Sequence, residues 1–251
     1  MISALGFFSP EAVESQVGIK TAYRDVFAIS EELSKLLLRL LRDADIDQAS
    51  VKNMAINALA AKSLELFQSS IILLERGCIP AAKALCRVFI ETVYKLCALQ
   101  VSPDAVELYI AQSSATRLQK LKCIKKYNQK HSVKAPEIDA EVESLAKLKP
   151  KRTEPYQWAL LAQMQDFHNT YYQGLSDDVH SNIESLNHYF DDTSKHLVSF
   201  GPSDTHLTLV ATACHRTMLH AIEKYASFQA ANISDELTQL SPRIDALEKP
   251  H

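Results

Sequence analysis

Apolar residues recur every three or four positions along most of this chain, and this periodicity constrains its fold more than any other feature. In residues 20–44 the pattern consists of Val26, Ile29, Leu33, Leu36, Leu37 and Leu40. Such spacing is typical of an amphipathic α-helix whose apolar side faces a core. The sequence shows no convincing pair of strand-like segments and no repeat of roughly 20 to 50 residues. We therefore expect an all-α fold.

Residues typical of helix N-termini divide this pattern into successive helices. Those that begin predicted helices are Ser9-Pro10, Asp47, Pro80, Ser102-Pro103, Pro136, and either Ser203 or Asp204. Gly77 stands where a residue in the left-handed conformation would end the helix predicted for 47–76. We expect residues 1–240 to form a single helical bundle of about seven to nine helices, with a polar insert at about 125–153. Residues 241–251 are expected to be a flexible tail.

The composition excludes several functional classes. Only five of the 251 residues are glycine, and the absence of GxGxxG, GxxxxGK[ST] and GxSxG argues against dinucleotide-binding, P-loop and α/β-hydrolase proteins. The absence of CxxC argues against zinc ribbons and redox dithiols. A net charge of −3 and a pI near 6.3 disfavour a large basic face for duplex DNA. With neither a signal-peptide pattern nor a bilayer-length apolar run, we expect a cytoplasmic protein that does not associate with membranes.

A polar stripe is predicted on the helix that opens at Pro80, opposite its apolar side. Lys83, Arg87 and Glu91 follow one another at four-residue spacing, and Tyr94 completes the stripe. Arg87 and Glu91 are therefore neighbours on one face and can form an ion pair. A solvated pair of this kind contributes only a few tenths of a kcal/mol. Because the neighbouring helices are very apolar, we expect the pair to be partly covered, as charge pairs at functional sites often are.

A second polar row lies near the middle of the C-terminal half. His168, Tyr172, Ser176 and His180 are spaced by four residues, so an α-helix would place them along one face. Their ring nitrogens and hydroxyls can position a phosphate, a proton or another helix. One alternative is a purely structural polar network. Another is a metal site, because the row continues to Glu184 and His188, although ligands from a second helix would be needed.

Four lysines near the end of the helix predicted for 102–130 form a basic run: Lys120, Lys122, Lys125 and Lys126. Their ammonium groups are suited to holding the phosphates of a nucleic acid. The alternative is a solvated helix end, where the helix dipole favours positive charge.

Two segments together resemble a widespread, uncharacterised bacterial helical family. The segment ERGCIPAAKALCRVFIETVYKL resembles its Arg-x-x-x-Glu helix, and YYQGLSDDVHSN resembles its Tyr-x-x-x-Ser-x-x-x-His signature, with Trp158 before it as in family members. The resemblance spans roughly residues 60–230. It implies an all-helical fold similar to the HEPN superfamily (higher eukaryote and prokaryote nucleotide-binding), which includes many toxin and phage-defence ribonucleases, often dimeric. The residues carried over are Arg87, Glu91, Tyr172, Ser176 and His180.

The resemblance implies a bacterial defence or toxin protein that acts on RNA without a metal or other cofactor. In such a ribonuclease His180 would be the base for a ribose 2′-hydroxyl and Arg87 would stabilise the charge of the phosphorane. The chain departs from catalytic HEPN domains, which carry Arg, a polar residue and then His four to six intervening residues after the Arg; Arg216 and His220 are one residue short. A non-enzymatic interaction module, or a subunit of a larger defence or regulatory assembly, is the alternative. A metal-dependent hydrolase using His180, Glu184 and His188 is a third.

The leucine content of the N-terminal half indicates self-association. Residues 36–41 contain five leucines, which cover more of a helix than one neighbouring helix can bury. Large exposed apolar patches usually mark interfaces. We therefore expect a two-fold homodimer to which the helix of 20–44 or that of 47–76 contributes. The alternative is that the N-terminal segment and the last helix cover the excess within one chain.

Overall fold

The computed structural model describes residues 6–175, 186 and 201–248. Helices form all the regular structure of these residues, which include no strand, so the predicted all-α class is confirmed. None of the described helices is both long enough and apolar enough to cross a membrane. In chain order the elements are the 3-10 turn Gly6–Phe8, α1 (Pro10–Ala22), α2 (Arg24–Arg42), α3 (Val51–Glu75), α4 (Ile79–Val101), α5 (Ala105–Lys130), α6 (Pro136–Lys147), α7 (Pro155–Leu161), α8 (Gln165–Phe167), a π-helical turn (His168–Tyr172), α11 (Leu207–Phe228) and α12 (Ser234–Leu247).

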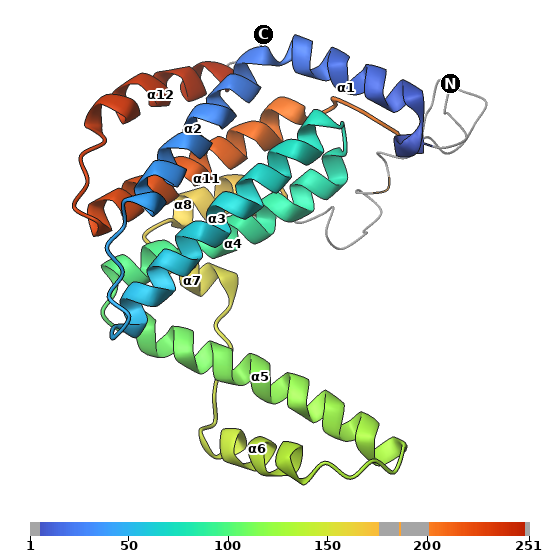
Figure 1. Cartoon of the computed structure of the whole chain (residues 1–251), viewed down its shortest axis with the longest axis vertical. Helices are drawn as coiled ribbons and strands as arrows, with labels where there is room; N and C mark the ends of the chain where they lie inside the picture. The colour runs from blue at the N-terminus through green and yellow to red at the C-terminus, as the bar shows by residue number, and fades with distance from the viewer. Residues whose placement is uncertain (1–5, 176–185, 187–200, 249–251) are drawn as a thin grey trace.

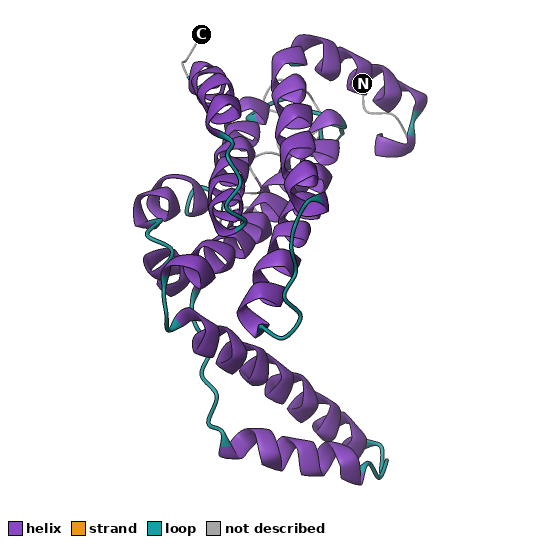
Figure 2. Ribbon diagram, turned by 60° about the vertical axis from the view of Figure 1, so that its left-hand side comes forward, coloured by secondary structure: helices purple, strands orange, loops and turns teal. Residues whose placement is uncertain are grey.

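Helix α4 lies at the centre of the bundle. It packs against α3 and α11 along its length and contacts α7 and α5, while α2 and α12 complete the outer layer beside α11 (Figures 1 and 2). Its predicted apolar stripe is buried, with Phe89, Val93 and Leu96 inaccessible to solvent. Because α3 and α11 cover this stripe, the polar residues of α4 emerge only on the side that α5, α7 and the π-helical turn approach.

Some of the predicted capping residues begin helices in the structure and others do not. Ser102, predicted to begin a helix, is the C-cap of α4, and α5 begins after Asp104. Ser9 caps α1, its hydroxyl accepting the backbone N–H of Ala12 at 3.2 Å. Helix α3 is capped by Ser50 rather than Asp47, since the Ser50 hydroxyl accepts the N–H of Asn53 at 3.2 Å. Asp47 instead accepts the N–H of Ala49 in the preceding turn. Both carboxylate and hydroxyl can cap a helix, and the sequence alone does not decide between two caps three residues apart.

Three further predicted boundaries are wrong. The helix predicted for 20–44 spans only Arg24–Arg42, because the chain turns at Tyr23 and residues 20–22 are the end of α1. The last long helix, α11, begins after His206 rather than at Ser203 or Asp204, and it ends at Phe228. Residues 241–247, predicted to be part of a tail, continue α12, and its Leu240 and Ile244 are buried in the core. Burial of this apolar pair on one side of α12 outweighs the Pro and charge content that favoured a tail.

Helices α5 and α6 form an antiparallel hairpin that projects from the bundle (Figures 1 and 2). The hairpin has a small core of its own, made of Leu118, Leu121 and Val142. Ion pairs also join its helices: Arg117 pairs with Glu141, and Lys125 pairs with Asp139 at 2.8 Å. The predicted polar insert at about 125–153 belongs to this hairpin. The hairpin itself begins before residue 125, because α5 already projects from the bundle (Figure 1).

The chain covers most of the leucine-rich surface of α2 by itself. Leu36, Leu37 and Leu40 are buried under the helices that pack on α2, namely α3, α11 and α12. Leu38 remains 45% exposed, and Ile72 on α3 remains 53% exposed. These two residues border a groove of about 380 Å³ between α2 and α3.

The junction between α3 and α4 generates a stability prediction. Gly77 has a φ of 70°, and a Cβ there would lie 2.7 Å from the backbone nitrogen of Ser203. Gly77→Ala therefore combines left-handed strain with a backbone clash, and we expect it to lower the free energy of unfolding by about 2 kcal/mol or more in a denaturation experiment. Gly18→Ala, in the exposed interior of α1 with nothing within 4 Å, is the control and should be neutral or stabilising by up to about 1 kcal/mol. Equal effects of the two substitutions would contradict this reading of the junction.

Candidate functional site

The two predicted polar motifs meet at the hydroxyl of Tyr172. Arg87 Nη2 donates a hydrogen bond to this hydroxyl at 2.8 Å, and the hydroxyl donates to Glu91 Oε1 at 2.6 Å. The Nε of Arg87 is 3.7 Å from the same Glu91 oxygen. We call Arg87, Glu91 and Tyr172 the tyrosine cluster. It joins residues more than 80 positions apart in the chain, a contact that the sequence motifs alone left open.

The tyrosine cluster is covered on one side and open on the other. Tyr172 is only 5% exposed, whereas the side chains of Arg87 and Glu91 are 17% and 30% exposed. The Arg87 guanidinium also lies over the Tyr172 ring, 4.7 Å from its centroid. Burial, together with the hydrogen bond to Glu91, raises the pKa of Tyr172 to about 12. The hydroxyl is therefore protonated at neutral pH, and its one proton is donated to Glu91.

Tyr172 is placed by a π-helical turn rather than by the α-helix that the spacing predicted. In this turn, His168–Tyr172, the N–H of Gln173 bonds to the carbonyl of His168 at 3.2 Å, which is the i to i+5 pattern. The rings of His168 and Tyr172 stack with centroids 4.5 Å apart. Single π-turns of this kind occur frequently at functional sites.

Aromatic rings surround the buried side of the tyrosine cluster. The ring centroid of His168 lies 5.9 Å from that of Tyr94 and 5.3 Å from that of Tyr156. Burial lowers the pKa of His168, and Arg87 lowers it further, so the ring is neutral near pH 7. The Tyr94 hydroxyl and His168 Nδ1 are buried without a hydrogen-bond partner among the described residues. Most buried polar atoms in proteins are paired, so this pair of atoms beside Tyr172 distinguishes the region from a fully satisfied structural network.

Several predicted residues lie outside the described part of the chain. These are Ser176 and His180 of the predicted catalytic row and Glu184 and His188 of the metal alternative. Within the described residues, no group of three or more His, Cys, Asp or Glu side chains is placed to hold a metal ion. The described site therefore consists of the tyrosine cluster and its aromatic surroundings.

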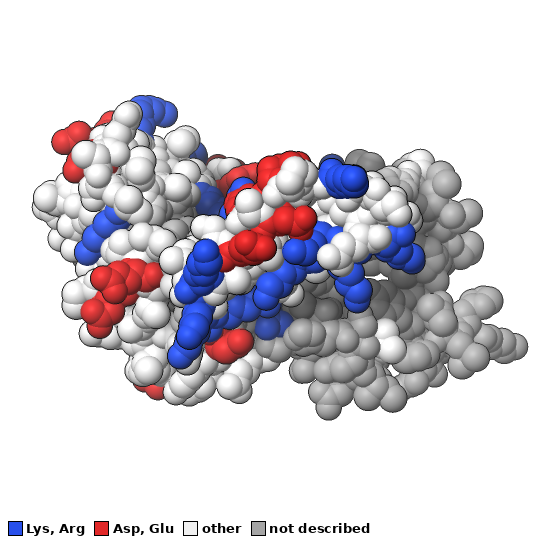
Figure 3. Space-filling model, turned by 90° about the horizontal axis from the view of Figure 1, so that it is seen from below, with Lys and Arg blue, Asp and Glu red and all other residues white. Residues whose placement is uncertain are grey.

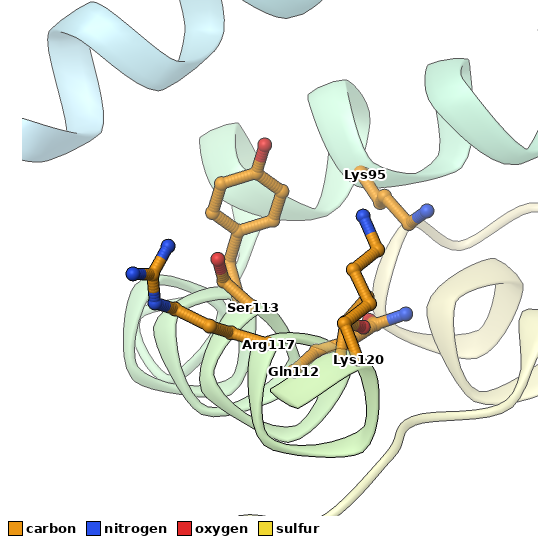
Figure 4. Close-up of a pocket in the computed structure, with 7 residues that line it drawn as sticks. Lys95, Gln112, Ser113, Arg117 and Lys120 are labelled. Carbon is orange, nitrogen blue, oxygen red and sulfur yellow. The ribbon is translucent and has the colours of Figure 1, made fainter. Parts of the chain in front are cut away.

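A second polar feature, a cleft of about 410 Å³, lies between α4 and α5. Its positive residues are Lys95 of α4 and Arg117 and Lys120 of α5. Its neutral residues are Tyr109, Gln112, Ser113 and Thr116. We call these seven residues the basic cleft (Figure 4). On the side of the α5 and α6 hairpin, Lys and Arg side chains gather in a band beside a parallel band of Asp and Glu (Figure 3).

The four lysines predicted to bind nucleic acid are not equivalent in the structure. Lys120 lines the basic cleft, whereas Lys125 is paired with Asp139. Lys122 and Lys126 are exposed on α5 outside the cleft. Sequence analysis missed Lys95, although it continues the four-residue spacing of Arg87 and Glu91 and was available from that pattern.

Comparison with known proteins identifies a family but no characterised relative. Residues 53–197, more than half of the chain, match DUF5677, described as a family of unknown function. This range begins in α3 and includes both the tyrosine cluster and the basic cleft. No curated protein and no solved structure matches the chain.

The tyrosine cluster generates a test of its energetic role. Tyr172→Phe removes the hydroxyl that joins Arg87 to Glu91 and keeps the ring that stacks on His168. We expect a loss of about 1 to 2 kcal/mol of unfolding free energy, or a Tm lower by about 2 to 8 °C, measured by thermal denaturation. Tyr127→Phe makes the same chemical change at a ring that is 62% exposed and should leave the Tm unchanged. A Tyr172→Phe variant as stable as the wild type would show that the hydroxyl contributes no net stabilisation.

Proposed function

The chain belongs to the DUF5677 family, whose function is unknown, and we propose that it is a HEPN-like bacterial defence or toxin protein that binds and cleaves RNA without a metal ion. The tyrosine cluster is the proposed reaction centre, together with Ser176 and His180 outside the described residues. The proposal combines the resemblance of two short motifs to the HEPN superfamily with the arrangement of charges on α4. Fold-level analogy alone is a weak warrant for an activity, so the proposal depends mainly on the site.

The observation that carries the proposal is that one helix joins the tyrosine cluster to the basic cleft. Arg87, Glu91 and Lys95 follow one another at four-residue spacing on α4, which places Lys95 about 12 Å along the helix axis from Arg87. Glu91 lies close enough to Lys95 to raise the pKa of Lys95, whereas burial lowers it. A polyanion held in the cleft would thus have the guanidinium of Arg87, a charged hydrogen-bond donor, within reach of its next segment.

The proposed reaction is a transesterification of the RNA backbone. His180 takes the proton of a ribose 2′-hydroxyl, and the 2′ oxygen attacks the adjacent phosphorus. Arg87 stabilises the charge on the phosphorane oxygens. The bond between phosphorus and the 5′ oxygen breaks, and the 5′ oxygen takes the proton of the Tyr172 hydroxyl. The products are a 2′,3′-cyclic phosphate and a 5′-hydroxyl end.

One observation favours the alternative of a non-enzymatic interaction module. The Tyr172 hydroxyl accepts from Arg87 and donates to Glu91, which is also how a residue that only stabilises a helix junction would be bonded. In that case changes in the tyrosine cluster would affect stability and no reaction. Measuring the two quantities on the same variants separates these functions.

The decisive experiment is incubation of the purified protein with single-stranded RNA in the presence of EDTA, with product ends analysed. We expect the wild-type protein to leave cyclic phosphate ends. The cleavage rate of His180→Ala and of Arg87→Lys should be lower than that of the wild type by a factor of about 100 or more. His131→Ala, at an exposed histidine after α5, is the matched control and should cleave at the wild-type rate. Induced expression in a bacterium should slow growth for the wild type and the control alone.

The absence of cleavage by the wild-type protein would reject the ribonuclease proposal. Loss of thermal stability in the variants, with no activity in any sample, would favour the interaction module. A wild-type activity that EDTA abolishes would favour the metal-dependent alternative.

We also propose the two-fold homodimer, with the groove between α2 and α3 as the contact. Its exposed apolar residues Leu38 and Ile72 belong to the apolar surface of α2 and α3 that the rest of the described chain leaves partly uncovered.

Light scattering coupled to gel filtration at micromolar concentration tests the dimer. We expect the mass of two chains for the wild type and of one chain for Leu38→Lys, because a charge in an apolar contact is costly. Leu148→Lys, at a residue 67% exposed beyond α6, should leave the mass unchanged. A wild-type mass of one chain would reject the dimer.

A further inference from the structure

We propose that the basic cleft between α4 and α5 is a binding site for a phosphate group, and that the phosphate it takes is a backbone phosphate of a single-stranded RNA. The choice of RNA as the source rests on the proposed function, whereas the phosphate chemistry follows from the cleft itself. The argument depends on which hydrogen-bonding groups line the cleft and on the charges they carry.

The side chains that line the cleft present donors. Lys95, Lys120 and Arg117 carry N–H groups and no acceptor, and Tyr109, Ser113 and Thr116 contribute hydroxyls, which can donate. Among the described residues, no carboxylate lines the cleft. An unprotonated phosphate oxygen only accepts hydrogen bonds, so a donor-lined, positively charged surface is complementary to it.

Gln112 also lines the cleft, and its side-chain amide carries both an acceptor oxygen and a donor nitrogen, whose orientation Trp158 fixes. The indole N–H of Trp158, which is 1% exposed, donates to Gln112 Oε1 at 2.6 Å. An indole can only donate, so the amide oxygen must face Trp158, and this acceptor of Gln112 is already engaged there. In Figure 4 the side chain of Lys120 extends from α5 toward the side chain of Lys95 on α4, and Gln112 lies beside the base of Lys120.

Lys95 and Lys120 carry positive charge that no described carboxylate neutralises within ion-pair distance. Burial lowers the pKa of Lys95, and Lys62 on α3 lowers it slightly, while Glu91 raises it. A partly buried ammonium group is stabilised when an anion approaches it, so the cleft gains from binding a phosphate. Arg117 differs, because Glu141 of α6 already holds it in an ion pair.

The volume and the aromatic ring of the cleft favour a nucleotide unit over a free ion. About 410 Å³ is more space than a single phosphate needs and lies in the range of small-molecule sites. Tyr109 is held by an edge-to-face contact with Trp158, at 6.4 Å between ring centroids. A fixed aromatic ring beside cationic groups is how single-stranded nucleic acids are commonly bound, through stacked bases and neutralised phosphates.

The test is fluorescence anisotropy of a short labelled single-stranded RNA with four variants. We expect Lys95→Gln and Lys120→Gln each to raise the Kd about tenfold and to reduce the slope of log affinity against log salt by about 1. Lys126→Gln, the same change on the same helix outside the cleft, should alter the Kd less than about twofold. Lys95→Arg keeps the charge and should bind almost as the wild type does, and thermal denaturation verifies that each variant folds.

A second titration with inorganic phosphate and pyrophosphate separates this inference from the proposed function. If the wild type binds RNA and Lys126→Gln weakens it as much as Lys95→Gln does, the cleft is overturned as the site while RNA binding stands. If the wild type binds no RNA but binds pyrophosphate, and Lys95→Gln abolishes that binding, the phosphate site is supported. RNA is then rejected as the molecule that supplies the phosphate. If neither ligand binds, the inference fails. An uncleaved RNA that binds through Lys95 and Lys120 supports the cleft and rejects only the cleavage chemistry.

Discussion

The burial of α4 is the constraint on which the remaining structure depends. Three sides of this helix are covered, by α3, by α11 and by α7 with the start of α5, and its stripe from Ile79 to Leu96 is almost inaccessible to solvent. Its charged residues must therefore lie where that packing ends, because an unpaired charge inside the bundle would be very costly. Arg87, Glu91 and Lys95 occupy this strip. The position of the candidate site is thus a consequence of the core.

Within that strip, the tyrosine cluster satisfies charges that are too covered to be fully solvated. The Arg87–Glu91 contact of 3.7 Å is long for a direct hydrogen bond, and the Tyr172 hydroxyl supplies shorter links to both partners. The π-turn brings the Tyr172 ring under the guanidinium while stacking it on His168. The neutral His168 and the unpaired Tyr94 hydroxyl behind it leave polar capacity that packing alone does not require. This excess is the physical reason for treating the junction as a candidate site.

The sequence predicted those parts of the fold that depend on local chemistry. Pro80, Pro136 and the left-handed Gly77 mark helix ends through effects confined to a few residues, and the three- and four-residue spacing on α4 identified its buried side. The family resemblance singled out Arg87, Glu91 and Tyr172 but left open whether the two motifs meet, because their contact depends on how the π-helical turn packs on α4. The π-turn, the break at Tyr23 and the helical course of 241–247 were not predictable, because tertiary packing decides them against local preference. Likewise, which basic residues of α5 form ion pairs and which line the cleft depends on the residues of α6 that pack against them.

This division of the basic residues of α5 explains how a chain with a net charge of −3 can still offer a phosphate site. The acidic residues of α6 pair with the side of α5 that faces them, as Asp139 does with Lys125 and Glu141 with Arg117. Lys120 points instead toward α4 and meets Lys95, where no carboxylate lines the space. Two of the positive charges of α5 are thus paired with α6, while Lys120 and Lys95 leave positive charge in the cleft, which overall charge cannot reveal. Since Lys95 and the tyrosine cluster share one rigid, buried helix, any ligand held in the cleft is held at a fixed distance from Arg87 and Glu91.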